Sequence, residues 1–144
     1  MCQQASEVLT YQGVIYHIGE RPLEQYLKKN KIEFYPTISV CWRGYVGTWK
    51  VGENKLYLTS LSANLIGSVK VGLDFLFQSQ TEVFADWFSG FLCLPQGEII
   101  GQVYNSTFTT PVFEESIILT FENGSLVSEK TIKNVVPEYE DLPF

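Results

Sequence analysis

Residues 41–58 read CWRGYVGTWKVGENKLYL, and this stretch decides the fold. It predicts two strands joined by a two-residue turn at Glu53-Asn54, because that register gathers the apolar side chains on one face. A turn one residue earlier would set two lysines opposite each other, and a three-residue loop would turn one apolar set outward. The predicted opposite pairs are Val51 and Leu56, Trp49 and Leu58, Lys50 and Tyr57, and Thr48 and Thr59. We therefore expect Trp49 to be buried in the core.

Three further turn signals lie between apolar runs. Asn123-Gly124 is the strongest, because Asn-Gly favours the type I′ turn of two-residue hairpins. Pro95-Gln96-Gly97 likewise predicts a turn, with residues 98–104 as the returning strand. Gln12-Gly13 predicts the turn of a short hairpin over residues 8–18. Hairpins are therefore expected to supply most of the strands.

The remaining segments have mixed patterns. Residues 21–30 predict one short helix, whose apolar stripe must rest on the sheet because about two to three turns are not stable alone. Residues 69–77 carry apolar side chains at alternate positions and predict a strand with one solvent-exposed face. Residues 83–94 share a helix face at their start and read as a strand at their end, and periodicity alone does not separate the two.

The composition favours β structure. Aromatic residues make up 15% of the 144 residues, and the 45% of hydrophobic residues suffices for the core of one domain. Residues 1–144 are therefore expected to form a single domain with a flexible acidic tail at 137–144. Gly44 and Gly47 interrupt a strand and favour curvature. The predicted fold class is all-β: a single strongly curved antiparallel sheet or barrel of hairpins with one short helix.

The charge balance argues against several partners. Ten basic against sixteen acidic residues give a formal charge of −6, which repels nucleic acid and anionic membrane surfaces. The N-terminus lacks the basic and apolar regions of a signal peptide, and no apolar run approaches the roughly 18 residues of a membrane span. We therefore expect a cytoplasmic protein that binds neither nucleic acid nor membranes.

Three motifs resemble a family of small uncharacterised bacterial proteins. They are Pro22-Leu23 with Tyr26-Leu27, the hairpin Trp42-Arg43-Gly44-Tyr45 with Trp49 and Leu56-Tyr57-Leu58, and Phe84-Ala85-Asp86-Trp87-Phe88-Ser89-Gly90. The resemblance covers most of the chain and implies a bacterial protein, but that family has no assigned activity to carry over. Gly47-Thr48-Trp49 also matches the Gly-x-Trp of lipocalin-like barrels. In that family the motif lies on the first strand, whereas here a hairpin and a helix precede it.

The chain offers little catalytic chemistry. His17 is its one histidine, so a Cys-His or Ser-His-Asp arrangement would have to pass through it. Cys2, Cys41 and Cys93 are an odd count without Cys-x-x-Cys spacing, and we expect reduced, inert thiols. No metal-binding or phosphate-binding motif is present, so we expect no metal and no cofactor. The pattern favours a protein that is not an enzyme.

Asp86, Trp87 and Trp42 are the candidate ligand-binding residues. A carboxylate among aromatic side chains can acquire a raised pKa suited to acid-base chemistry. The more common role for such a residue is to cap backbone N–H groups, and that alternative is favoured for Asp86. Arg43 is suited to recognise an anion or to stack on an aromatic ring, and a structural ion pair or cation–π contact is the more common role for such a residue.

The C-terminal tail carries the candidate partner-binding residues. Its carboxylates alternate with apolar side chains near two prolines, a pattern that suits docking in extended form on a basic partner. The alternative is a frayed acidic end without a role. The candidate residues are Glu138, Tyr139, Glu140, Asp141 and Phe144, with Arg43 as a further contact.

These patterns favour a non-enzymatic cytoplasmic module that binds a protein partner, in the manner of an inhibitor or immunity protein. The first alternative is a small-ligand-binding β-barrel, in which the aromatic side chains line a cavity instead of filling a core. The last alternative is a hydrolase of unknown type.

Overall fold

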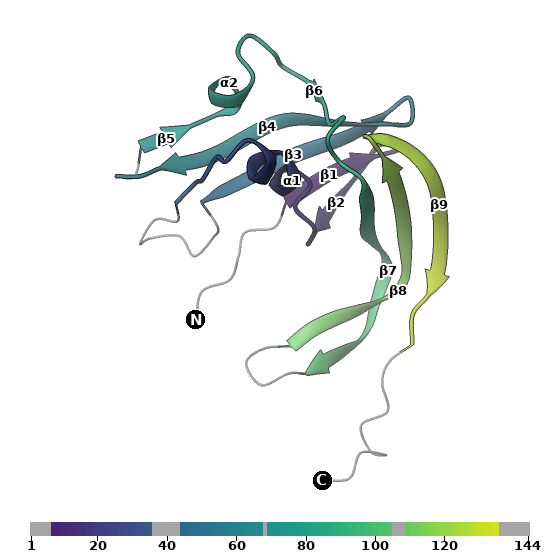
Figure 1. Cartoon of the computed structure of the whole chain (residues 1–144). Helices are drawn as coiled ribbons and strands as arrows, with labels where there is room; N and C mark the ends of the chain where they lie inside the picture. Colours follow the sequence, from purple (N-terminus) through teal and green to yellow (C-terminus); the bar gives the residue numbers. More distant parts are fainter. Residues whose placement is uncertain (1–6, 36–43, 68, 105–108, 136–144) are drawn as a thin grey trace.

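The computed structural model describes residues 7–35, 44–67, 69–104 and 109–135. In these ranges nine strands form one sheet, and two helices lie beside it (Figure 1). The strands are β1 (Glu7–Tyr11), β2 (Val14–Ile18), β3 (Tyr45–Gly52), β4 (Lys55–Leu65), β5 (Val69–Val71), β6 (Val83–Phe84), β7 (Gly90–Tyr104), β8 (Thr109–Glu122) and β9 (Ser125–Lys133). The helices are α1 (Leu23–Lys29), between β2 and β3, and α2 (Leu73–Leu76), between β5 and β6.

The sheet bends back on itself. Its strand order is β2-β1-β3-β4-β9-β8-β7, and β5 and β6 also pair with β4. The pairs are antiparallel except for β1 and β3, which run parallel. The two ends of this order, β2 and β7, adjoin but form no strand pair. The all-β class is therefore confirmed, and the sheet is open instead of closed into a barrel.

Three hairpins have the turns that the sequence predicts. Both turn residues have positive φ in each of them, which is the type I′ geometry. The φ angles are 51° and 79° at Gln12-Gly13, 52° and 60° at Glu53-Asn54, and 49° and 82° at Asn123-Gly124. Turn chemistry thus places β1 against β2, β3 against β4, and β8 against β9.

The central hairpin keeps the predicted register as far as Trp49 and Leu58. Beyond this pair a bulge adds Thr59, so Thr48 faces Ser60 and the predicted pair of Thr48 with Thr59 is wrong. The Thr59 hydroxyl instead donates to the Thr48 carbonyl oxygen at 3.1 Å. The bulge adds to the bend of the sheet.

The segment Pro95-Gln96-Gly97 is not a hairpin turn, so that prediction is wrong. β7 continues through it and pairs with β8 on both sides. The register slips between Gln96 and Ile99, and Gly97 takes the positive φ of 84°, which together define a β-bulge. A Cβ at Gly97 would lie 2.6 Å from a carboxylate oxygen of Glu114. Glycine and proline here mark a kink in one long strand.

The predicted strand over residues 69–77 is correct only for β5, because α2 follows it. Leu73, Leu76 and Phe77 fit the i, i+3, i+4 spacing of a helix as well as they fit a strand. All three pack against the core, and the Phe77 ring stacks on Trp87 with centroids 5.7 Å apart. Packing on the core thus decides between the two periodicities.

The predicted helix is confirmed as α1. Leu23 and Leu27 are buried, and the Tyr26 ring contacts Trp87 with centroids 4.9 Å apart. Residues 83–94 form β6, a connecting turn and the start of β7. Their beginning is therefore a short strand, and the helical alternative is not formed.

Two hairpin turns meet where the halves of the sheet join. Within the described ranges, β4 and β9 pair at one position. Leu56 donates its N–H to the Gly124 carbonyl oxygen at 2.9 Å, and Leu126 donates to that of Asn54 at 2.8 Å. The core lies between the two halves, and Trp49 is fully buried in it, as predicted.

Gly124 is a position where the packing of the β8–β9 turn against the segment after β6 should be measurable. A Cβ there would lie 2.4 Å from the Ala85 carbonyl oxygen, whereas Gly13 holds the same place in its own turn and has open space around it. Gly13→Ala should lose about 1–2 kcal/mol through backbone strain. Gly124→Ala should lose at least about 1 kcal/mol more in urea unfolding, because the clash is added. Equal losses would show that the Asn123-Gly124 turn does not pack against Ala85 in solution.

Candidate functional site

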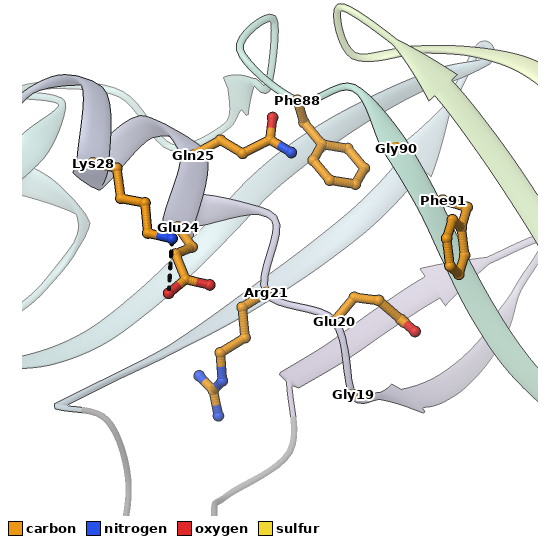
Figure 2. A pocket seen from close by; sticks show the side chains of 9 residues that line it. All are labelled: Gly19, Glu20, Arg21, Glu24, Gln25, Lys28, Phe88, Gly90 and Phe91. Carbon is orange, nitrogen blue, oxygen red and sulfur yellow. Dashed lines mark ion pairs between the residues drawn. The ribbon is translucent and has the colours of Figure 1, made fainter.

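A pocket of about 500 Å³ opens beside the start of β7 (Figure 2). One wall is the segment that leads from β2 into α1, and the other is the beginning of β7. We call it the seam pocket, because it lies where the two ends of the strand order adjoin. Its lining residues are Gly19, Glu20, Arg21, Glu24, Gln25, Lys28, Phe88, Gly90 and Phe91.

Two side chains bridge the seam where strand pairing is missing. The Gln25 amide binds both backbone groups of Ser89: Nε2 donates to the carbonyl oxygen at 3.0 Å, and Oε1 accepts from the N–H at 3.2 Å. The Glu20 carboxylate accepts from the Cys93 N–H at 3.2 Å. Side chains therefore take the place of a neighbouring strand at Cys93 on β7 and at Ser89 just before it.

Phe91 lies midway between these two bridged residues. Hydrogen bonds alternate in direction along an antiparallel strand, so the Phe91 N–H and C=O point the same way as those of Cys93, two residues further along β7. No group among the described residues bonds to them. The Phe91 side chain lines the pocket and is 57% exposed. A backbone donor, a backbone acceptor and an aromatic ring are thus open to a ligand.

The wall opposite Phe91 is charged. Glu24 and Lys28 form an ion pair, 3.9 Å apart, on the exposed side of α1, and Figure 2 shows this pair across the pocket from Phe91. Glu20 adds a second carboxylate. Apart from Arg21, the charged side chains among the described lining residues are then two carboxylates and one ammonium group. This balance favours a ligand that carries a cationic group.

Arg21 lines the pocket but does not offer its charge there. Figure 2 shows its guanidinium group turned away from Phe91. Its Nη1 lies 3.2 Å from Glu7 Oε2 and donates to the Tyr45 carbonyl oxygen at 3.1 Å. The Arg21 and Glu7 side chains are 6% and 0% exposed. This ion pair is therefore structural and lies behind the pocket wall.

Glu7 collects three donors in the core. Its Oε1 accepts from Trp49 Nε1 at 2.7 Å, and its Oε2 accepts from the Gly47 N–H at 2.8 Å and from Arg21. Burial raises the pKa of the Glu7 carboxyl group, against the lowering effect of these donors and of the Arg21 charge. The network ties the segment before α1 to β1 and β3, and so fixes the pocket wall.

The predicted ligand-binding and partner-binding residues are placed only in part. Trp42-Arg43 and residues 138–144 lie outside the described residues. Asp86 is exposed on the connection between β6 and β7. The Trp87 Nε1–H donates to the Pro22 carbonyl oxygen at 2.9 Å, and its ring belongs to the aromatic cluster beside α1. Asp86 and Trp87 do not line the seam pocket, and their ligand-binding role stays a prediction.

The structure also describes only some of the residues that could form a Cys-His pair. His17 is exposed on β2, and Cys93 is a partly buried free thiol on β7. Cys2 and Cys41 fall outside the described ranges. Among the residues that the structure describes, no cluster of three His, Cys, Asp or Glu side chains could hold a metal ion.

Sequence reasoning missed the seam pocket. Gln25 and Glu20 read as ordinary polar residues of a helix and a loop, and Phe91 reads as one member of an apolar run. The bridging contacts span 64 and 73 positions of the chain, so no local spacing marks them. The signal is tertiary and appears only when the strand order is known.

No family model, no curated protein and no solved structure matches the chain. The resemblance to small uncharacterised bacterial proteins therefore stays a prediction. In the described part of the chain, neither helix has the length and apolar character needed to cross a membrane.

Proposed function

We propose that the protein is a non-enzymatic interaction module that binds an extended segment of a basic protein partner at the seam pocket. The observation that carries the proposal is Phe91, whose exposed ring stands beside a backbone N–H and C=O that no described residue binds. A peptide satisfies such groups when it lies along an edge strand. The formal charge of −6 supports a basic partner.

The pocket suits a short contact with a cationic side chain. Only one residue of the β7 edge is open between the two bridges, so backbone pairing there amounts to about two hydrogen bonds. Specificity then depends on side chains. A lysine or arginine of the partner can stack on the Phe91 ring and reach the carboxylates of Glu20 and Glu24.

The C-terminal tail is proposed as a second contact with the same partner. Glu138, Glu140 and Asp141 would be attracted to a basic surface, while Tyr139 and Phe144 would fill apolar pockets on it. An inhibitor or immunity protein that covers a basic target in the cytoplasm would combine both contacts.

Partner capture with matched variants tests the pocket. Wild type, Phe91→Ala and Ile66→Ala are used as baits in lysate of the source cells. Ile66 is 74% exposed and does not line the pocket, so its truncation should leave capture unchanged. Phe91→Ala should lose the captured protein while its thermal unfolding stays close to that of wild type. Capture that is equal for all three baits would overturn the role of the pocket.

Salt dependence tests the tail. The association rate with the captured partner, measured by stopped flow, should fall markedly from low to physiological ionic strength, because ions screen exposed charges. Deletion of residues 138–144 should remove most of this dependence. Equal salt slopes for the full-length and truncated chains would leave the tail without a role in binding.

A small-ligand-binding protein is the second candidate, because a volume of about 500 Å³ lies within the range of ligand sites. Thermal shift with a panel of metabolites and lipids separates the two. A large, reproducible shift with one compound class that disappears in Phe91→Ala would assign the pocket to a small molecule. No shift with any class would leave the protein partner as the occupant.

A further inference from the structure

β9 is an open edge of the sheet over most of its length. Leu126 is tied to the neighbouring hairpin, because its N–H donates to the Asn54 carbonyl oxygen at 2.8 Å. After this residue, the described part of the chain pairs β9 with β8 alone. The side chains of residues 127–133 are all exposed, and Figure 1 shows β9 at the outer border of the sheet.

The backbone groups of this edge have a defined direction. Asn134 donates its N–H to the Glu114 carbonyl oxygen at 3.0 Å, so the even-numbered residues after the bulge face β8. Glu129, Thr131 and Lys133 therefore point their N–H and C=O groups outward. A row of such groups is a template for pairing with another strand.

We propose that two copies of the chain pair through β9, in antiparallel orientation, about a two-fold axis at Thr131. The free edge runs from Val127, just after the tie to Asn54, to Val135 at the end of the described chain. Thr131 is the midpoint of this stretch, so two edges overlap fully only when Thr131 faces its own copy. Pairing of the outward groups then forms about six backbone hydrogen bonds at the centre.

The same register is complementary in charge and in hydrophobicity. Glu129 faces Lys133 of the second copy, and symmetry makes a second such ion pair. Val127 and Val135, which are 54% and 84% exposed, also face each other across the axis. Shifted by one in-phase step in one direction, the register sets two copies of Lys130 opposite each other, and the next step opposes two copies of Glu129. Shifted in the other direction, it opposes two copies of Ile132 and then two copies of Lys133, and both Glu129–Lys133 pairs are lost. The register centred on Thr131 is therefore the one that forms both ion pairs.

A second copy fits this edge better than the basic partner proposed for the seam pocket. The edge carries two lysines and one glutamate between residues 129 and 133, so it would repel a basic strand. The residues that line the seam pocket belong to β7, α1 and the segments before them, and none belongs to β9. The dimer therefore uses other residues than the pocket of the proposed function.

Charge reversal with mixing tests the dimer. Sedimentation velocity from about 10 µM to about 1 mM should show wild type passing from monomer to dimer. Glu129→Lys sets lysine against Lys133 at both pairs, and Lys133→Glu sets glutamate against Glu129. Each change should raise the dissociation constant at least about tenfold. An equimolar mixture of the two should dimerise again, because both pairs become complementary. Lys70→Glu, on the exposed edge of β5, is the matched control and should match wild type.

A third variant tests the backbone. Thr131→Pro removes an outward N–H that no described residue of the monomer binds, so it should abolish the dimer and keep the monomer folded. Glu129 also accepts from the Tyr11 hydroxyl, so Glu129→Lys removes a contact within the monomer. If this variant disturbs folding, Lys133→Glu and Thr131→Pro decide the outcome. Wild type that stays monomeric at about 1 mM, or a dimer that all three variants leave unchanged, would overturn the proposal.

Discussion

Arg21→Met should lower the free energy of unfolding by about 3–5 kcal/mol at pH 7. Methionine fills a similar volume, but it leaves the fully buried Glu7 carboxylate without its positive partner. Lys28→Met is the matched control, because Lys28 is 78% exposed and its pair with Glu24 lies at the surface. The control should lose less than about 1 kcal/mol. Urea unfolding measures both.

The loss in Arg21→Met should shrink as the pH falls. Burial raises the pKa of Glu7 above its ordinary 4.5, and Arg21 is one of the groups that lower it, so the variant raises this pKa further. In the folded state the Glu7 carboxyl group then keeps its proton at a pH where the same group has released its proton in the unfolded chain. Lowering the pH from 7 toward 4.5 therefore stabilises the folded state.

A double variant isolates the buried charge. Glu7→Gln/Arg21→Met has no ionisable group at this place, so it should be more stable than Arg21→Met at pH 7 and should lose the extra pH dependence. If Arg21→Met shows the same loss at pH 5 and pH 7, the unpaired Glu7 carboxylate is not the cause of the destabilisation.

Trp49→Ala should cause the second large loss, about 3–5 kcal/mol. The side chain is fully buried, stands opposite Leu58 and donates its Nε1–H to Glu7. Trp49→Phe keeps part of the ring and removes the N–H, so its stability should lie between those of wild type and Trp49→Ala. A loss below about 1 kcal/mol for Trp49→Ala in urea unfolding would mean that the core face of the central hairpin is assigned wrongly.

Sequence patterns predicted the features that depend on near neighbours in the chain. The turns at Glu53-Asn54 and Asn123-Gly124 follow from residues that accept positive φ, and the pairing beside them follows from apolar alternation. α1 follows from a stripe of apolar residues at helical spacing. These signals act over a few residues, so one sequence suffices to read them.

Two errors came from patterns that fit two structures. Pro95-Gln96-Gly97 suits a hairpin turn, and it equally suits a bulge where the strand continues and glycine avoids the side chain of Glu114. Residues 73–77 fit both a strand and a helical turn. In each case contacts with residues distant in the sequence decide which structure forms. Local sequence preference carries no information about those contacts.

The seam pocket and the free edge of β9 depend on strand order. The sequence suggests neighbouring hairpins, but it does not say that β9 joins β4 or that β1 runs parallel to β3. The bridge from Gln25 to Ser89 exists only because that order brings the two ends of the sheet together.

The junction of the two hairpin turns and the seam hold the sheet together by two different kinds of contact. Each half of the sheet keeps its own ladder, while backbone bonds around Gly124 and Asn54 join the halves at the middle of the strand order. At the two ends of the strand order, the side chains of Gln25 and Glu20 bond to the backbone of Ser89 and Cys93 instead. One closure thus depends on backbone groups that any sequence supplies, whereas the other depends on two side chains that single substitutions remove.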